Sequence, residues 1–398
     1  MNFTVKQFVR THVPNTPFFQ RLLARARLKQ LSVYDAMEKK VRESKDRESS
    51  AFRSQIVKEC FAKWPEKAGR IKKEAQEILP LSADYKDREL TPELLDDVVF
   101  TFFGLGFTPD EYVYFRLEKK TVEERMGYLS NKQKGKFHSH YDNLIESSVF
   151  TDKYLTYLRF RKDFQRELVE IDGPGNYPAF EAFVGRHPKY VKKDVYESCA
   201  RSVELVDSAN CGKTLRQQYD EMAAGSKFVV EELIVQSDDM ASFNPTSVNT
   251  VRCITMYTKN GVCVPFAYFR TGSKGSFVDN CGIRSELDTK TGLSITDGFD
   301  ERANRFPAHP DTGAVYKGFQ IPEWDQLLEI VTRAASQVPD IRIIGWDFAH
   351  TDKGWVIVEG NAMSQIELVQ IPFERGMRKE FEDIFRQMEP IIEYDFDN

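Results

Sequence analysis

The sequence predicts a mixed fold, α/β or α+β, that follows a helical N-terminal region. Two observations predict it. Residues 1 to about 90 are charged and follow a helical pattern, and the chain remains mostly helical to about residue 180. Runs of β-branched and aromatic residues bounded by polar turns then follow, with helical patterns at 213–223 and 323–337 between them. Such alternation of strands and helices is typical of a single mixed module.

Composition and charge exclude several classes of protein. The 398 residues are 41% hydrophobic and 29% charged, which is ordinary for a globular chain of about two or three domains. A net charge of −5 and a pI near 5.9 argue against nucleic acid as a partner. No apolar run approaches a membrane span, no secretory signal is visible, and the six cysteines include no C-x-x-C pair. We therefore expect a cytoplasmic protein without a zinc ribbon.

The first thirty residues form a basic amphipathic segment. No acidic residue precedes Asp35, and basic side chains alternate with large apolar ones: Lys6, Arg10, Arg21, Arg25, Arg27 and Lys29 among Phe3, Phe8, Phe18, Phe19, Leu22 and Leu23. Such a segment can bind an anionic membrane surface. It can also be a solvated helix that packs on its own domain, and we favour this second interpretation.

Local signals place individual helices and strands. Thr108-Pro109-Asp110-Glu111 puts an N-cap, a first-turn proline and a capping-box glutamate in order, and Thr121-Val122-Glu123-Glu124 repeats the box. We therefore expect helices to begin after Thr108 and Thr121. Strands are expected at 189–193, 201–206, 227–235, 250–258 and 262–270.

The segment GWDFAHTDKGWVIVEGNA, residues 345–362, reads as a β-hairpin. A three-residue turn at Asp352-Lys353-Gly354 makes the pairing symmetric about Lys353. Asp347 and Glu359 are then direct cross-strand neighbours, with Cβ atoms about 5 Å apart. Because side chains alternate between faces, Asn361 shares the face of Glu359.

Two opposed carboxylates destabilise a hairpin. A bound cation removes the repulsion, and ligation by a few carboxylate and amide oxygens suits Mg²⁺ together with waters and phosphates. The spacing therefore favours a metal site at Asp347, Glu359 and Asn361. The alternative is that the two acids lie at a solvated rim and repel only weakly.

Mg²⁺ held by few protein ligands usually accompanies a nucleotide, so we looked for a phosphate-binding loop. DSANCGKT (207–214) has the context of a P-loop, but Asp207 occupies the first glycine position, and Gly212-Lys213-Thr214 is better explained as a helix start. In YVKKDVYESCARSVELV (190–206), Lys193 ends one strand before a loop rich in small residues. Backbone N–H groups of such a loop, together with Lys193, can bind phosphates.

In this order, these segments resemble the ATP-grasp superfamily, and more narrowly its sugar-transfer associated branch. The resemblance covers about residues 100–370 and rests on FTDKYL (150–155), YVKKDVYESCARSVELV (190–206), FVVEELIVQ (228–236), PTSVNTVRCITM (245–256), VPFAYFRTGSKGSFVDNCGI (264–283), HPDTG (309–313) and IGWDFAHTDKGWVIVEGNA (344–362). It implies an α+β ATP-grasp fold in which two α+β lobes enclose ATP, with a helical region at 1–90. Within the fold we expect a mostly helical part at 91–180, a lobe with lid and hinge at 181–235, and a C-terminal lobe with the metal site at 236–398.

The resemblance also implies a role for each matched position. Lys153 and Lys193 would hold the ATP phosphates, and the loop at 197–202, with Ser198 and Ser202, would be the lid over them. The hinge for adenine would be Glu231, Glu232, Leu233 and Ile234. The metal ligands would be Asp347, Glu359 and Asn361, in agreement with the hairpin argument.

The chain departs from the usual pattern of the superfamily at three places. Small residues stand where the lid usually carries glycines, and Asp194 replaces the proline that usually follows the second lysine. D-alanine ligases place an arginine two residues before the metal aspartate, whereas this chain has Gly345 there. The substrate of those ligases is therefore not carried over.

Enzymes of this superfamily mostly join a carboxylate to an amine. ATP phosphorylates the carboxylate, the amine attacks the acyl phosphate, and the protein mainly neutralises charge and aligns the reactants. Arg252 and Arg270, each near a strand end, are expected to steady the transferred phosphate or a substrate carboxylate, because a guanidinium offers a planar fork. Asn280 and Arg284 are expected to line the acceptor side.

The resemblance thus predicts an ATP- and Mg²⁺-dependent carboxylate–amine ligase for small molecules. Its substrate would be a cell-surface sugar precursor of polysaccharide biosynthesis, an amino acid or a small peptide. The alternatives are an ATP-dependent kinase on the same fold and a degenerate nucleotide-binding module that recruits glycan-pathway partners. The sequence indicates no oligomeric state.

Overall fold

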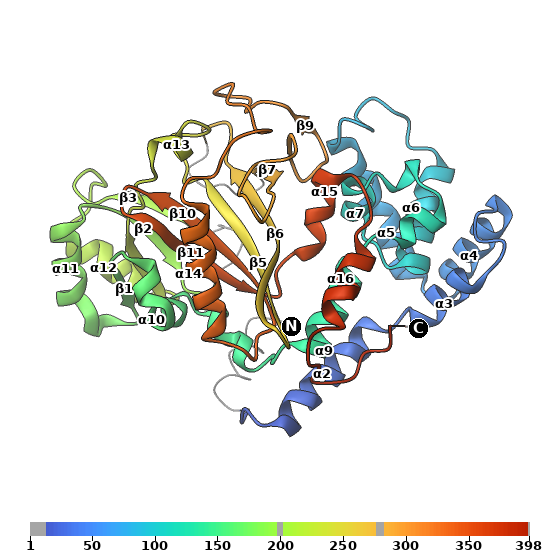
Figure 1. Cartoon of the computed structure of the whole chain (residues 1–398), viewed down its shortest axis with the longest axis horizontal. Coiled ribbons are helices and arrows are strands. Elements are labelled where there is room, and N and C mark those ends of the chain that lie inside the picture. The colour runs from blue at the N-terminus through green and yellow to red at the C-terminus, as the bar shows by residue number, and fades with distance from the viewer. Residues whose placement is uncertain (1–12, 197–201, 276–281, 397–398) are drawn as a thin grey trace.

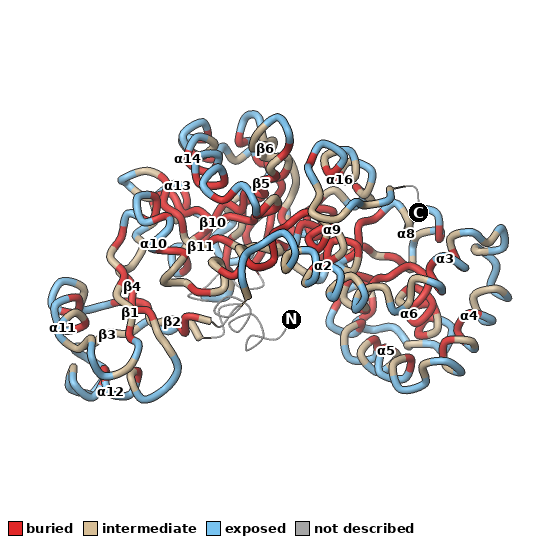
Figure 2. The backbone as a smooth tube through the Cα atoms, turned by 90° about the horizontal axis from the view of Figure 1, so that it is seen from below, coloured by how far each residue is buried: buried red, intermediate tan, exposed pale blue. Residues whose placement is uncertain are grey.

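The computed structural model describes residues 13–196, 202–275 and 282–396. Three parts lie side by side: a helical region, a seven-stranded sheet in the middle and a four-stranded sheet at the opposite end (Figure 1). Buried backbone runs through the large sheet and into the helical region (Figure 2). The chain thus has the α+β architecture expected from the sequence.

The N-terminal part is helical, as predicted. Its helices are α2 (Pro17–Leu31), α3 (Asp35–Glu43), α4 (Ser50–Lys63), α5 (Pro65–Ile78), α6 (Pro92–Leu105), α7 (Pro109–Tyr114), α8 (Val122–Met126), α9 (Asn131–Tyr141) and α10 (Lys153–Phe164), with 3-10 turns η1 (Leu79–Leu81), η2 (Leu117–Lys119) and η3 (Glu146–Thr151). Both predicted capping boxes form, at Thr108 with Glu111 and at Thr121 with Glu124. The core of this region includes Phe299, Leu368 and Ile371 from far along the chain, so the helices share their packing with the C-terminal part.

The four-stranded sheet is antiparallel and has the order β1-β4-β2-β3. Its strands are β1 (Leu168–Ile171), β2 (Lys189–Asp194), β3 (Glu204–Asp207) and β4 (Phe228–Glu232), and its helices are α11 (Tyr177–Arg186) and α12 (Leu215–Ala223), with a 3-10 turn η4 (Pro174–Asn176). β1 lies in the stretch expected to be mostly helical. Thr214 caps α12 in a capping box with Gln217, which confirms the helix start predicted for 212–214.

The seven-stranded sheet is also antiparallel and has the order β11-β10-β5-β6-β7-β8-β9. Its strands are β5 (Thr250–Thr258), β6 (Gly261–Thr271), β7 (Ile283–Glu286), β8 (Gly298–Phe299), β9 (Arg305–Phe306), β10 (Ile343–Thr351) and β11 (Gly354–Ala362). The remaining elements are α13 (Asp238–Ala241), α14 (Trp324–Ser336), η5 (Ile366–Val369), α15 (Gln370–Phe373) and α16 (Arg378–Phe385).

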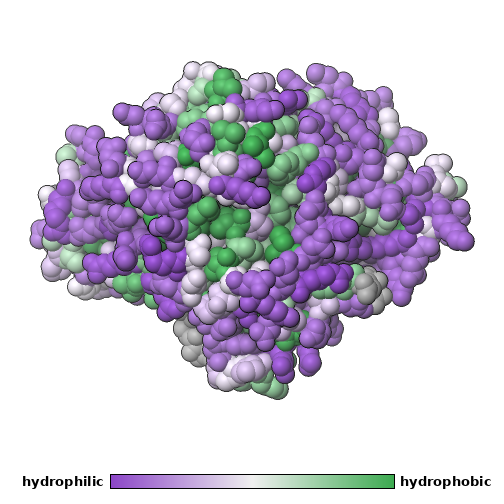
Figure 3. Space-filling view, viewed as in Figure 1, coloured by the Kyte–Doolittle hydropathy of each residue, from purple (hydrophilic) through white to green (hydrophobic). Residues whose placement is uncertain are grey.

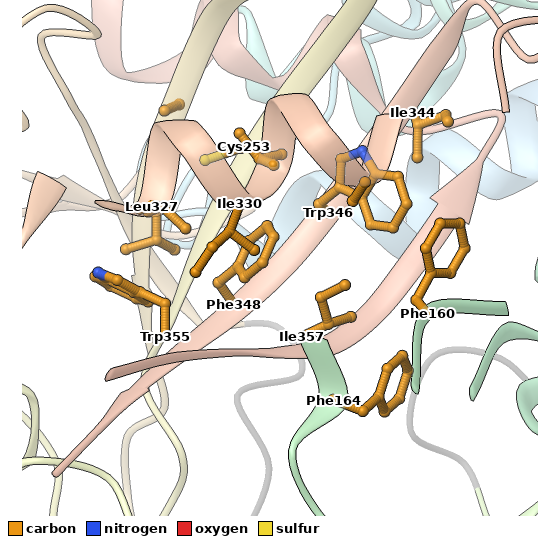
Figure 4. Packing of buried hydrophobic residues seen from close by; sticks show 14 of the residues in the cluster. Phe160, Phe164, Cys253, Leu327, Ile330, Ile344, Trp346, Phe348, Trp355 and Ile357 are labelled. Carbon is orange, nitrogen blue, oxygen red and sulfur yellow. The ribbon is translucent and has the colours of Figure 1, made fainter. Parts of the chain in front are cut away.

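The large sheet is buried on both faces. Trp346 and Phe348 of β10 point toward Leu327 and Ile330 of α14, with Phe160 and Phe164 of α10 beside them (Figure 4). On the other face, Ile254, Phe266 and Tyr268 pack with residues of α9 and α16. The side of the molecule seen in Figure 3 is mostly hydrophilic, with hydrophobic residues gathered in its middle. Burial on both faces makes the sheet a rigid base for polar side chains that project from one of them.

The hairpin of β10 and β11 confirms the predicted pair and corrects the predicted turn. Asp347 pairs with Glu359, as expected. The turn, however, contains only Asp352 and Lys353, because Thr351 pairs with Gly354. That register alone would slip the pair by one residue, but a β-bulge between Asp347 and Phe348 restores it. The predicted neighbours are therefore brought together by a bulge and not by a three-residue turn.

α2 packs on α9, as the favoured interpretation of the basic N-terminal segment expects. Its outer side nevertheless exposes Phe18 (69%) and Leu22 (51%) beside the basic row Arg21, Arg25 and Lys29. No helix in the described ranges is long and apolar enough to cross a membrane. Contact with an anionic membrane surface stays a prediction.

Vesicle sedimentation tests this contact. If it occurs, the protein binds vesicles that contain phosphatidylserine at low salt, and replacing Arg21, Arg25 and Lys29 with Gln lowers partitioning about 100-fold, at about 1 kcal/mol per basic residue. Replacing Lys39, Arg70 and Lys73, which are exposed elsewhere in the helical region, is the matched control. Equal binding by both triple variants would contradict a role for α2.

Candidate functional site

A cavity of about 430 Å³ lies where the two sheets meet, between the end of β4 and the β10–β11 hairpin. Most of the residues singled out in the sequence line it: Lys153, Lys193, Ser202, Glu231, Glu232, Leu233, Ile234, Arg270, Asp347 and Glu359. Arg252, Arg284 and Asn361 do not line it, and Ser198 and Asn280 lie outside the described residues. The structure thus gathers into one place residues that are about 200 positions apart.

One side of the cavity is apolar. Its lining residues include Phe164, Leu168, Val191, Leu205, Val229 and Val358. Leu233, Ile234 and Val235 continue beyond the end of β4, outside both sheets, and pass along this side. An apolar slot beside extended backbone suits a flat heteroaromatic ring that also needs hydrogen bonds at its edge.

Two lysines mark the opposite, polar side. Lys153 begins α10 directly after the N-cap Asp152, and its Nζ donates to the carbonyl oxygen of Asp194 at 2.9 Å. Burial lowers the pKa of Lys153, and the charge of Lys193 lowers it further, whereas Glu359 raises it. Two half-buried ammonium groups on the same side of a cavity form a site that favours an anion such as phosphate.

Glu231 is the centre of a buried ion-pair network. Its carboxylate pairs with Lys193 and accepts from Arg166 Nη2 at 3.1 Å. Arg166 also donates to the carbonyl oxygens of Ile357 at 2.5 Å and Val358 at 3.3 Å. Burial acts to raise the pKa of Glu231, but the charges of Lys193 and Arg166 outweigh it and lower the pKa below its ordinary value. The side chain of Glu231 is therefore bonded to Lys193 and Arg166. Its backbone belongs to β4, where the predicted hinge at 231–234 begins.

Asp347 is balanced by two arginines. Arg252, its neighbour on β5, pairs with it through Nε and Nη2, the latter at 2.6 Å, and Arg270 donates at 3.3 Å. Burial acts to raise the pKa of Asp347, yet both arginines lower it below its ordinary value, and Asp347 in turn raises the pKa of Arg252. The charge of Asp347 is therefore offset by guanidinium partners, and a metal ion is not needed for that.

A metal ion remains compatible with this donor set. No group of three or more His, Cys, Asp or Glu side chains among the described residues is arranged to hold a metal by itself. The predicted set has two carboxylates and one amide, and it fits Mg²⁺ because that ion keeps waters and nucleotide phosphates as ligands. Asn361 has a buried Nδ2 without a hydrogen-bond partner. The ligand roles of Asp347, Glu359 and Asn361 stay predictions.

Gly345 explains why the chain lacks an arginine two residues before Asp347. A Cβ at this position would lie 2.1 Å from Ser364 Oγ and 3.2 Å from Arg252 Nη1. The space over Gly345 is therefore taken by Arg252, which reaches Asp347 from the neighbouring strand.

Sequence reasoning missed the segment between β4 and β5. Gln236 donates to the carbonyl oxygens of Asn244 and Ser247, both at 2.8 Å, and the buried Asn249 donates to Met240 at 2.7 Å. These bonds hold Pro245, Thr246, Ser247 and Val248 against the cavity. In the sequence, the motif PTSVNTVR contributed only to the family resemblance. The amide side chains of this segment do not reveal from the sequence which carbonyl groups they bind. Arg166 was missed for the same reason.

One comparison with known proteins matches a family over part of the chain. Residues 201–386 match the family model described as sugar-transfer associated ATP-grasp. This confirms the predicted resemblance over that stretch, which includes residues 231–234 and the β10–β11 hairpin, while Lys153 and Lys193 precede it. A search of curated proteins found no match.

Solved structures give more distant likenesses. The ATP-grasp ligase PsnB, complexed with minimal precursor, is 13% identical with a TM-score of 0.40, covering 62% of this chain and 63% of that one. The D-Alanine-D-Alanine ligase from Helicobacter pylori is 14% identical with a TM-score of 0.38, covering 63% and 62%. The L-amino acid ligase from Bacillus licheniformis is 14% identical with a TM-score of 0.38, covering 62% and 50%. In each case the match spans less than two thirds of the other protein.

The network around Glu231 generates a stability prediction. Glu231→Gln leaves Arg166 and Lys193 without their buried counter-charge, so we expect the free energy of unfolding at pH 7 to fall by about 3–5 kcal/mol. The folded pKa of Glu231 lies below 4.5, so its stabilisation is complete above about pH 4.5 and is lost as the pH falls through the folded pKa. Urea unfolding from pH 7 to pH 3 should therefore show the difference between wild type and variant shrinking in acid.

Glu204→Gln is the matched control, since Glu204, on the more exposed strand β3, pairs with Lys192 of β2 at the surface. We expect a change below about 1 kcal/mol. A difference between wild type and Glu231→Gln that stays constant with pH would contradict the network.

Proposed function

We propose that the chain is an ATP- and Mg²⁺-dependent ligase that joins a substrate carboxylate to an amine through an acyl phosphate. One observation carries the proposal: Lys153, Lys193, Arg270, Asp347 and Glu359 line a single cavity whose other side is apolar. A nucleotide needs this combination, with an apolar seat for its base and cations for its phosphates.

The proposed seat places adenine on Leu233, Ile234 and Val235, and the phosphates beside the two lysines. Their positive charges offset the phosphate charge and align the γ-phosphoryl group with the acid. Asp347, Glu359 and Asn361 would hold Mg²⁺, which supplies further neutralisation of the phosphates. The substrate carboxylate then takes the γ-phosphoryl group, and the amine attacks the acyl carbon and displaces phosphate.

Arg252 and Arg270 are proposed to have different parts in this reaction. Arg252 contacts Asp347 through two nitrogens and is buried, whereas Arg270 makes the longer contact of 3.3 Å and lines the cavity. Arg270 is therefore the better placed to turn toward a phosphoryl group or a substrate carboxylate. Arg252 is placed to hold Asp347 in position.

The substrates are proposed to be small molecules of the cytoplasm, with a sugar precursor of a cell-surface polysaccharide or an amino acid as the first candidates. The description of the matched family supports the sugar candidate. The apolar and cationic sides of the cavity support ATP as a common requirement of every candidate.

Thermal unfolding with Mg²⁺-ATP tests the nucleotide site. A ligand at about 100 times its Kd adds about 2.7 kcal/mol to the stability of the folded state, so the melting temperature of the wild type should rise clearly. Glu359→Gln should remove most of this rise, because it removes one predicted metal ligand. Glu329→Gln, on the exposed side of α14, should keep it. A rise that is equal in all three proteins would contradict the assigned site.

Product analysis separates the proposed ligase from its rivals. With candidate acids and amines we expect ADP and phosphate to be released together with an amide. A stable phosphorylated product formed without any amine would instead indicate a kinase. AMP and pyrophosphate would reject the acyl-phosphate route, and nucleotide binding without any turnover would indicate a degenerate module.

A further inference from the structure

A polar row continues across the large sheet, beyond the cavity. Asp347, Arg252, Tyr268 and Glu286 are successive cross-strand partners from β10 to β7. Such partners lie on the same face of a sheet. This is the face opposite α14, since the alternate residues Cys253 and Phe269 belong to the core on that side. The row leads from the proposed nucleotide site toward the helical region.

Arg284 stands one strand beyond Arg270 in this direction. The two arginines are direct partners across β6 and β7, and neighbouring strands lie about 4.8 Å apart. Arg270 lines the cavity, whereas Arg284 is buried, with 6% of its surface exposed. Its guanidinium lies 5.8 Å from the ring of Tyr268, on the same face.

The guanidinium of Arg284 is not satisfied by the protein. Among the described residues, Arg284 is the one arginine in which two buried nitrogens, Nε and Nη1, lack a hydrogen-bond partner. Arg125, which is buried to a similar degree, contrasts with it: it makes two bonds to Asp97, at 2.8 and 3.0 Å, and one to Thr101 at 2.8 Å. A buried cation without a partner destabilises a folded protein, so its presence calls for a ligand.

Glu286 lies two residues further along the same strand, and it too is buried with a polar atom that lacks a hydrogen-bond partner. Only 1% of its surface is exposed, and its Oε2 has no hydrogen-bond partner. Burial raises its pKa well above the ordinary value, although the charge of Arg284 lowers it. Its unbonded Oε2 is therefore available to accept a hydrogen bond from a ligand.

Helices enclose this end of the row. α15 packs on β7 and β8, and it lies between the large sheet and the helical region (Figure 1). Burial raises the pKa of Tyr114, at the end of α7, and the nearby Arg284 acts to lower it, so this helix also borders the row. Arg284 and Glu286 are therefore shielded from bulk water between the sheet and the helices.

We propose that Arg284 and Glu286 form a subsite for a non-reacting carboxylate of the substrate and the N–H or O–H group beside it. Arg284 pairs with the carboxylate, and Glu286 accepts from the neighbouring ammonium or hydroxyl group. The substrate class is then an amino acid or a carboxylated sugar, whereas a plain amine or a neutral sugar lacks the recognised group. The subsite rests on the proposed function, since it lies beside Arg270 at the end where a second substrate would approach.

Stability measurements distinguish a binding role from a structural one. If the two groups await a ligand, Arg284→Met and Glu286→Gln leave the melting temperature of the free protein unchanged or raise it by a few degrees. Arg125→Met is the matched control and should lower it strongly, because it removes the buried guanidinium that bonds both carboxylate oxygens of Asp97. A fall in Arg284→Met as large as that in Arg125→Met would overturn the subsite.

Ligand probes then test its chemistry. Glycine and glucuronate at millimolar concentration should raise the melting temperature of the wild type, whereas ethylamine and glucose should not. Arg284→Met should abolish the rise, and Glu286→Gln should keep it, because the amide oxygen can still accept the hydrogen bond. Glu286→Leu should lose it. A wild type that no carboxylated probe stabilises, or a rise that survives in Arg284→Met, would overturn the subsite.

Turnover provides the last arm. In the ADP-release assay we expect Arg284→Met to lower kcat/KM about 100-fold for a carboxylated substrate and less than about 3-fold for its counterpart without the carboxylate, a difference of at least about 2 kcal/mol. Equal losses for both would overturn the subsite. If carboxylated probes bind in an Arg284-dependent way but no acid and amine pair releases ADP, the subsite stands and the ligase function fails.

Discussion

The cavity depends on one buried guanidinium that joins the two sheets. Arg166 reaches Glu231 on the interior strand β4 of the small sheet and the carbonyl groups of Ile357 and Val358 on the hairpin of the large one. Because Glu231 also pairs with Lys193, the same network orients a lysine that is proposed to bind the ATP phosphates. The apolar slot, the lysines and the hairpin acids keep their relative positions only while this connection is intact.

Each of two buried carboxylates in the site is offset by two cationic side chains. Lys193 and Arg166 offset Glu231, while Arg252 and Arg270 offset Asp347. When a nucleotide binds with its metal ion, its phosphates would replace some of these carboxylates as partners of the lysines and arginines. The metal ion would in turn become a partner of the carboxylates. Exchange of this kind requires that some contacts be weaker than others, and the 3.3 Å contact of Arg270 is the weaker of the two at Asp347.

Local signals in the sequence predicted more of the fold than of the site. Capping boxes and β-branched runs placed most helices and strands, because their causes lie within a few residues. The pairing of Asp347 with Glu359 was predicted for the wrong reason, since a bulge and not the turn sets the register. The partners of Asp347 could not be predicted, because β5 and β6 are about 80 to 95 residues away. Arg166, Gln236 and Asn249 escaped notice because a single polar residue does not reveal which distant carbonyl group it binds.

The crowding over Gly345 has a consequence for the evolution of this fold. A cationic partner for Asp347 could come from position 345 of its own strand or from the adjacent strand. Both would need the same space, which is occupied here by Arg252 and Ser364. A side chain at position 345 therefore requires a coordinated replacement of Ser364, and of Arg252 if the new residue is to take over the contact with Asp347. The three positions are coupled, so the tolerance of each to substitution depends on the residues at the other two.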